Sequence, residues 1–199
     1  MLPSGYTLSW VSGPDPELLL LSEAKDHLRV KSDAEIQLVQ QKLRAARIAV
    51  ESEIGKPVGR QVFETKLTAW PALLVFPRLP FIELVSIYYT KEDGTVVAFY
   101  DPAASPPVDP ATFTVQSGGD FRFGELHFDP LETWPTATLA RGWPITIRFT
   151  AGIESLPPNL RDAWLLKLEL LYDRNVLNAE LLDRAFRALC SPSAIETIT

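Results

Sequence analysis

The sequence predicts an α+β fold in which helices from both ends of the chain form one bundle and an antiparallel β region is inserted between them. Apolar residues recur at helical spacing in residues 18–60 and 151–190, whereas residues 61–150 alternate with a period of two and are rich in β-branched and aromatic side chains. Residues 1–17, with three prolines and two glycines, are expected to form an extended arm, and residues 191–199 a short tail.

Two helices are predicted near the N-terminus. Ser22 can cap a short helix that extends through Arg29, and residues 32–35, Ser-Asp-Ala-Glu, match a capping box that begins the second. This second helix is expected to end at Gly55, because glycine suits the left-handed C-terminal position and Pro57 blocks continuation. Its apolar seam suits packing against another helix and comprises Ile36, Val39, Leu43, Ala46, Val50 and Ile54.

The middle of the chain is expected to be mostly antiparallel sheet. Residues 91–94 and 117–120 contain the glycines and aspartates typical of hairpin turns, and two Pro-rich loops cover residues 101–110 and 129–144. The predicted strands are residues 62–67, 81–90, 95–100, 111–116, 121–128 and 145–150.

A long helix is predicted over residues 156–176, since Pro157 and Pro158 fit its unpaired first turn. Its apolar side chains wrap most of the circumference, so it should be covered on nearly all sides. That cover could come entirely from the protein's own fold or partly from a neighbouring subunit. A last helix is expected over residues 178–189.

The amino-acid composition limits which kinds of protein this chain can be. A chain of 199 residues with 46% hydrophobic and 22% charged residues is typical of a soluble globular protein. The net charge of -6 argues against a generally basic nucleic-acid-binding surface. The single cysteine, Cys190, excludes an internal disulfide framework. With neither a secretory signal nor an apolar run long enough to span a bilayer, we expect a soluble chain made in the cytoplasm, with no membrane partner.

Two groups of residues are candidates for chemistry. Alternation on a strand would point Glu125, His127 and Asp129 to one face, where they could bind a metal in a small metal-dependent hydrolase; the simpler interpretation is the solvated face of an edge strand. Cys190 could pair with His127 and Asp120 as a thiol protease, but no nucleophile motif surrounds it. We therefore expect no enzyme, no metal and no cofactor.

A third hypothesis is a β-rich module that binds a small ligand or carbohydrate, suggested by Trp134 and Trp143. The fluorescence of exposed tryptophans would be quenched when such a ligand binds.

The order of these elements resembles the head-tail connector (adaptor) proteins of tailed bacteriophages and of phage-derived gene transfer agents. The likeness covers residues 20–175. It is carried by residues 21–30, LSEAKDHLRV, by residues 51–58, ESEIGKPV, and by residues 145–175, in which Phe-Thr-Ala-Gly at 149–152 precedes Leu156-Pro157 and a helix.

This resemblance implies a homo-oligomeric ring of about twelve copies in the neck of a virion or phage-like particle. The ring would lie between the portal protein and a tail-side stopper or neck protein, with an axial channel through which DNA passes without sequence-specific binding. In a cyclic ring, one face of each subunit must complement a different face of the next. The residues expected at the subunit or portal interface are Arg44, Arg47, Asp162, Trp164, Leu168, Glu169, Asp173 and Phe186.

Overall fold

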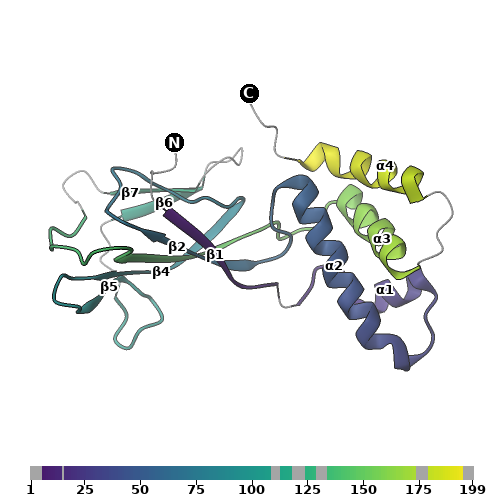
Figure 1. Ribbon diagram of the computed structural model, residues 1–199, viewed down its shortest axis with the longest axis horizontal. Coiled ribbons are helices and arrows are strands. Elements are labelled where there is room, and N and C mark those ends of the chain that lie inside the picture. Colours follow the sequence, from purple (N-terminus) through teal and green to yellow (C-terminus); the bar gives the residue numbers. More distant parts are fainter. Residues whose placement is uncertain are drawn as a thin grey trace. The chain divides into compact units, whose positions relative to one another are not determined.

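The computed structural model describes residues 6–14, 16–108, 113–117, 124–128, 134–173 and 179–194. The chain divides into two compact units (Figure 1). The β unit comprises Met1–Gly13 and Arg60–Gly152, and the helical unit comprises Pro14–Gly59 and Ile153–Thr199. Helices and antiparallel strands are both present, which confirms the predicted α+β class.

A five-stranded antiparallel sheet, in the order β1-β2-β8-β4-β5, forms the main part of the β unit (Figure 1). Strands β2 and β8 pair along their whole length, with Gln61 opposite Ala151 and Leu67 opposite Ile145. Buried and half-buried residues alternate along β2, as expected for a strand with one face on a core. The strands are β1 (Tyr6–Ser12), β2 (Gln61–Leu67), β8 (Ile145–Ala151), β4 (Phe81–Thr90) and β5 (Val96–Tyr100).

Aromatic side chains fill the core of the β unit. The ring centroid of Phe149, on β8, lies 5.9 Å from that of Phe63, 5.1 Å from that of Phe76 and 6.4 Å from that of Phe81. Ring pairs of this kind contribute about 0.5–1.5 kcal/mol beyond the burial of their area. The predicted β region therefore has a hydrophobic core of its own.

A smaller antiparallel sheet, in the order β3-β7-β6, belongs to the same unit. It contains β3 (Leu74–Val75), β6 (Phe113–Ser117) and β7 (Gly124–Phe128). The sequence predicted strands at the last two positions. It gave no signal for β3, because two residues are too few to show a periodicity.

Part of the expected N-terminal arm is a strand of the main sheet. Residues Tyr6–Ser12 pair with β2, and a bulge lies between Trp10 and Ser12. The indole N–H of Trp10 donates to the side-chain oxygen of Gln61 at 3.1 Å. The surrounding glycines and prolines favour an extended arm, whereas Tyr6, Leu8 and Trp10 alternate with polar residues as in a strand.

The helical unit contains α1 (Leu21–Leu28), α2 (Ile36–Ile54), α3 (Pro158–Tyr172) and α4 (Ala179–Cys190), together with short 3₁₀ turns at Asp33–Glu35 and Ser191–Ser193. Helix α2 ends as predicted, because Gly55 has a φ of 71° and its N–H donates to the backbone carbonyl of Glu51 at 2.8 Å. The capping box is only half formed. Ser32 accepts from the N–H of Ala34 at 3.2 Å, but the Glu35 carboxylate accepts from the hydroxyl of Tyr172 instead.

The predicted seam of α2 lies in the core of the helical unit. Ile36 is half-buried and the rest of the seam is buried. It packs with α3 residues and with Leu19, Ala24 and Cys190. Within the described residues, no helix is long and apolar enough to cross a membrane.

Candidate interaction surfaces of the helical unit

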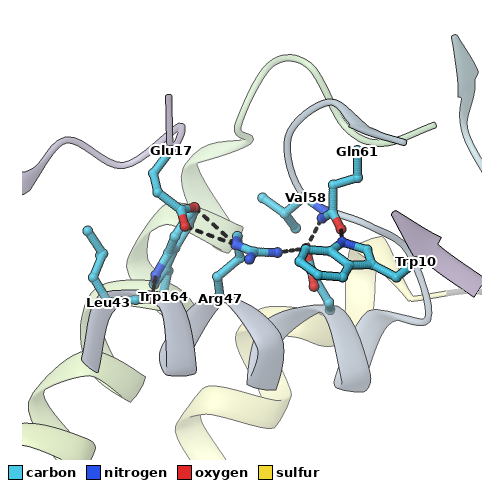
Figure 2. Close-up of polar contacts among 8 residues, drawn as sticks. Trp10, Glu17, Leu43, Arg47, Val58, Gln61 and Trp164 are labelled. Carbon is cyan, nitrogen blue, oxygen red and sulfur yellow. Dashed lines mark hydrogen bonds and ion pairs between the residues drawn. The ribbon is translucent and has the colours of Figure 1, made fainter. Parts of the chain in front are cut away.

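Arg47 is an internal residue of the helical unit. Its side chain is only 8% exposed. The terminal nitrogen Nη1 of Arg47 donates to Glu51 Oε1 at 2.6 Å (Figure 2). The Nε of Arg47 lies 3.0 Å from one carboxylate oxygen of Glu17 and donates to the other oxygen at 3.3 Å. Arg47 is therefore held by carboxylates of its own chain, which does not favour a contact with a neighbouring subunit, and its interface role stays a prediction. A buried guanidinium needs carboxylate partners close by, and this chain supplies both.

The same group of charges attaches two loops to α2. The backbone N–H of Val58 donates to Glu51 Oε1 at 2.9 Å, and Glu17 belongs to the segment that precedes α1 (Figure 2). Burial raises the pKa of the Glu17 carboxyl above 4.5, and the charge and hydrogen bond of Arg47 oppose that rise. The Arg47 cluster, defined as Glu17, Arg47, Glu51 and Val58, thus has a structural role.

Three apolar residues predicted at the interface are also internal. Trp164 and Leu168 are fully buried, and Phe186 is 3% exposed. The indole N–H of Trp164 donates to the backbone carbonyl of Leu43 at 2.9 Å (Figure 2). Their burial within the helical unit does not favour contact with a neighbouring copy, and their interface role stays a prediction. A helical pattern shows how much of a helix is covered, but not which chain provides the cover.

The acidic residues of α3 do lie on the surface. Asp162, Glu169 and Asp173 are all exposed. Two basic side chains lie beside this acidic stripe: His27 Nε2 is 3.5 Å from Glu169, and Arg161 Nη1 is 3.9 Å from Asp162. Arg161 also pairs with Glu23 of α1. The stripe therefore places three exposed carboxylates on a solvent-facing side of the unit.

The outer face of α2 carries exposed apolar side chains that the sequence analysis missed. Leu38 is 43% exposed and Ile48 is 57% exposed, with exposed Ala45 between them and exposed Arg44 alongside. The longer apolar seam dominates the helical pattern of α2, so this second apolar stripe is easily overlooked in the sequence. The spacing of Leu38, Ala45 and Ile48 could have revealed it, because steps of seven and three keep residues on one helix face.

Beside this face the surface has a shallow depression of about 200 Å³. It lies between the segment before α1 and one flank of α2. Its lining includes Leu20, which is 58% exposed, together with Gln40 and Arg44. The hollow is therefore continuous with the exposed stripe at Arg44.

The side chains of the candidate metal ligands in the β unit lie outside the described residues. Glu125 and His127 fall on β7, whose backbone pairs with β6, but their side chains and all of Asp129 lie outside the described residues. Among the side chains that are described, no group of three or more His, Cys, Asp or Glu residues is arranged to hold a metal ion. The alternative of a metal site at these three positions therefore falls outside the described residues.

Cys190 is buried at the end of α4. Burial raises the pKa of its thiol to about 11, and the negative charge of Glu53 adds to the rise. At neutral pH such a thiol is protonated and a poor nucleophile. This argues against the thiol-protease arrangement, of which Asp120 and the His127 side chain lie outside the described residues.

The two tryptophans suggested for ligand binding differ. The ring of Trp134 stacks on Trp70 with centroids 4.6 Å apart, and its N–H donates to the carbonyl of Pro71 at 2.6 Å. Trp143 is 44% exposed. Trp134 therefore packs within its own unit, whereas Trp143 lies on the surface, and the ligand-binding module stays a prediction.

Comparison with solved structures identifies chains of the same fold. A chain in the neck of an empty gene transfer agent particle, computed with C6 symmetry, matches with a TM-score of 0.69, and a chain in the neck of the native particle, computed with C12 symmetry, matches with 0.66. A chain in the virion of a native gene transfer agent particle matches with 0.71. Each match has 21% sequence identity and covers 97% of both chains. No protein-family model and no curated protein matches this chain.

Because the coverage includes nearly the whole chain, the likeness extends over both units. It establishes that the fold occurs in gene transfer agent particles.

Proposed function

We propose that the protein is a structural component of the neck of a phage or gene transfer agent particle, acting there as a head-tail adaptor. The observation that carries this proposal is the full-length likeness to chains of gene transfer agent necks. The likeness covers 97% of both chains, so it includes the β unit as well as the helical unit. A mechanical, non-enzymatic role accounts for this better than a hydrolase does.

In this proposal about twelve copies form a ring with an axial channel. The C6 and C12 symmetries of the necks that contain similar chains support a cyclic arrangement. The portal protein would contact one side of the ring, and a stopper or other neck protein the opposite side. DNA would pass through without sequence-specific contacts, which agrees with the net charge of -6.

The two units would have separate tasks in such a ring. The helices from the two ends of the chain would act as one bundle and hold the copies together, because their surface carries both an apolar stripe and an acidic stripe. The β unit would then be free to contact other neck components. This division follows the predicted boundaries at residues 18–60, 61–150 and 151–190.

The test is to locate the protein in particles. Particles purified from the source cells are probed with gold-labelled antibodies against this chain, and antibodies against the major capsid protein serve as the matched control. We expect gold at the junction between head and tail for this chain and over the whole head for the control.

Deletion of the gene gives a second measurement. If the protein joins head to tail, cells that lack it should release heads and tails that are not attached to each other. Complete tailed particles from the deletion strain, or antibody label absent from the neck, would refute the proposed function.

A further inference from the structure

Helices α2 and α3 present two different outer faces on opposite sides of the helical unit. The seam of α2 and the buried side of α3 pack together, with Trp164 donating to the carbonyl of Leu43. On α2 the stripe of Leu38, Ala45 and Ile48 lies about half a turn from that seam, at 100° per residue. On α3 the acidic stripe lies about half a turn from Trp164. The two stripes therefore point away from each other.

The outer face of α2 is uncharged at its centre and basic at its edge. Between Ile36 and Val50 the helix contains no acidic residue, and its basic residues are Lys42, Arg44 and Arg47. Because Arg47 is buried, Arg44 is the exposed cation beside the stripe. Ala45 leaves room at the centre of this face for the close approach of another helix.

The outer face of α3 complements it in charge and in shape. Asp162, Glu169 and Asp173 lie along it, and Leu166 is a half-buried apolar residue within the same row. A helix with a narrow ridge of this kind can pack over a small residue on its partner. Among the described residues, two basic side chains border the ridge: His27 lies beside Glu169, and Arg161 pairs with Glu23 and lies 3.9 Å from Asp162.

We propose that the outer face of α2 in one copy of this chain binds the outer face of α3 in the next copy. In this contact Arg44 lies against Asp162 and Glu169, and Leu166 packs over Ala45 beside Ile48. This contact rests on the proposed function and adds to it, because it names the face that each of the two faces binds in the neighbouring copy. Because the two faces differ and point in opposite directions, the contact repeats from copy to copy, as a ring requires.

The face does not suit a symmetric dimer. If two α2 faces met, Arg44 and Lys42 would approach their own counterparts, and two α3 faces would bring acidic stripes together. Like charges placed opposite each other oppose association. A head-to-tail contact between unlike faces avoids both repulsions.

Cysteine crosslinking tests which faces meet. The variants Ile48→Cys and Asp162→Cys place one thiol on each exposed face, while the native Cys190 is buried. Particles carrying the full-length variants are treated with a short bismaleimide and separated on a denaturing gel. We expect no crosslinked product from either single variant and a ladder of multimers from the double variant. A mixture of the two single variants should give dimers only.

Charge reversal provides a second measurement. Arg44→Glu should weaken association between copies at least about tenfold, because it faces two carboxylates in the proposed contact. Adding Asp162→Arg and Glu169→Arg to the same chain should restore association. Arg141→Glu, at an exposed position of the β unit, makes the same charge change elsewhere and should leave association unchanged.

The outcomes separate this interface from the proposed function. If the chain is present in the neck but the double variant gives no ladder, or a single variant crosslinks to itself, the interface is wrong and the neck role stands. If the chain is absent from particles and light scattering finds only monomer at every concentration, both are wrong. A ladder together with rescue by the reversed charges supports the interface.

Discussion

The indole N–H of Trp164 donates to the carbonyl of Leu43 at 2.9 Å and joins α3 to α2 in the centre of the helical unit. Leu43 is on the seam of α2, and Trp164 is fully buried. This contact fixes the relative position of the two helices whose outer faces we propose as the subunit interface. Its loss should therefore affect both stability and assembly.

Substitution of Trp164 separates packing from hydrogen bonding. Trp164→Ala should lower the free energy of unfolding by about 3–5 kcal/mol, because it leaves a large cavity. Trp164→Phe keeps most of the apolar volume and removes the donor, so we expect a loss of about 0.5–1.5 kcal/mol from the hydrogen bond, with a further part from the smaller ring. Urea unfolding followed by circular dichroism measures both, and equal losses would contradict this account.

Arg47 and Arg44 allow a buried arginine to be compared with an exposed arginine on the same helix. Arg47→Met should destabilise the protein by about 3–5 kcal/mol, because it leaves the carboxylates of Glu17 and Glu51 without their shared cation. Arg44→Met should change stability by less than about 0.5 kcal/mol, because Arg44 is exposed. The measurement is urea unfolding at neutral pH, and a similar loss for both variants would show that the Arg47 cluster is not structural.

Glu17 should make stability depend on pH in a defined direction. Its pKa in the folded protein is raised above 4.5, so the folded state binds the proton more tightly than the unfolded state. The contribution of this group is therefore fully present below pH 4.5 and is lost as the pH rises through the raised pKa. Glu17→Gln should remove that loss, and the urea midpoint should fall less between about pH 4 and about pH 7.5 than in the parent.

The control for this experiment is Glu180→Gln, at an exposed position of α4, which removes one carboxylate without touching the Arg47 cluster. It should leave the pH dependence of the parent unchanged. A steeper pH dependence in Glu17→Gln than in the parent would contradict the raised pKa.

Two glycines with the same backbone conformation separate steric clash from backbone strain. Gly59 has a φ of +81°, and a Cβ there would lie 2.6 Å from the Cβ of Pro14; Gly94 has a φ of +84° and nothing within 4 Å. Gly94→Ala should cost about 1–2 kcal/mol, which is the strain of the left-handed region alone. Gly59→Ala should cost clearly more, because the chain near Pro14 must shift. Thermal unfolding of both variants checks the difference, and equal losses would exclude the clash.

Cys190 should resist thiol reagents in the folded protein. Its burial and its pKa of about 11 leave almost no accessible thiolate at pH 7 to 8. We expect reaction with a maleimide to become fast only when denaturant unfolds the helical unit. Fast labelling of the native protein would show that α4 opens, and would also require Cys190→Ser as the background for the crosslinking experiment.

The sequence predicted the regular elements of this chain well where the pattern was long. The seam of α2 and the alternation along β2 each extend over enough residues to define a period. Strand β1 was missed, because Gly5, Gly13 and nearby prolines outweighed a short alternation. Strand β3 was missed because it has two residues.

The candidate interface was harder to predict than the fold. Trp164, Leu168 and Phe186 were selected because their helices are rich in apolar residues, yet these side chains pack inside their own unit. Arg47 was selected for its charge, although its carboxylate partners, Glu17 and Glu51, are in the same chain. Pattern alone does not distinguish an internal partner from an external one, whereas the structure shows which apolar side chains of α2 are exposed, among them Leu38 and Ile48.

The interleaving of the two units along the chain imposes an order on folding during synthesis. The β unit takes its first strand from before α1 and its remaining strands from residues 60–152, whereas the helical unit needs α3 and α4, which follow residue 152. On the ribosome the sheet can therefore be completed while α1 and α2 still lack their later partners. During that interval the seam of α2 is exposed to solvent, and this nascent segment is where a chaperone would bind most readily.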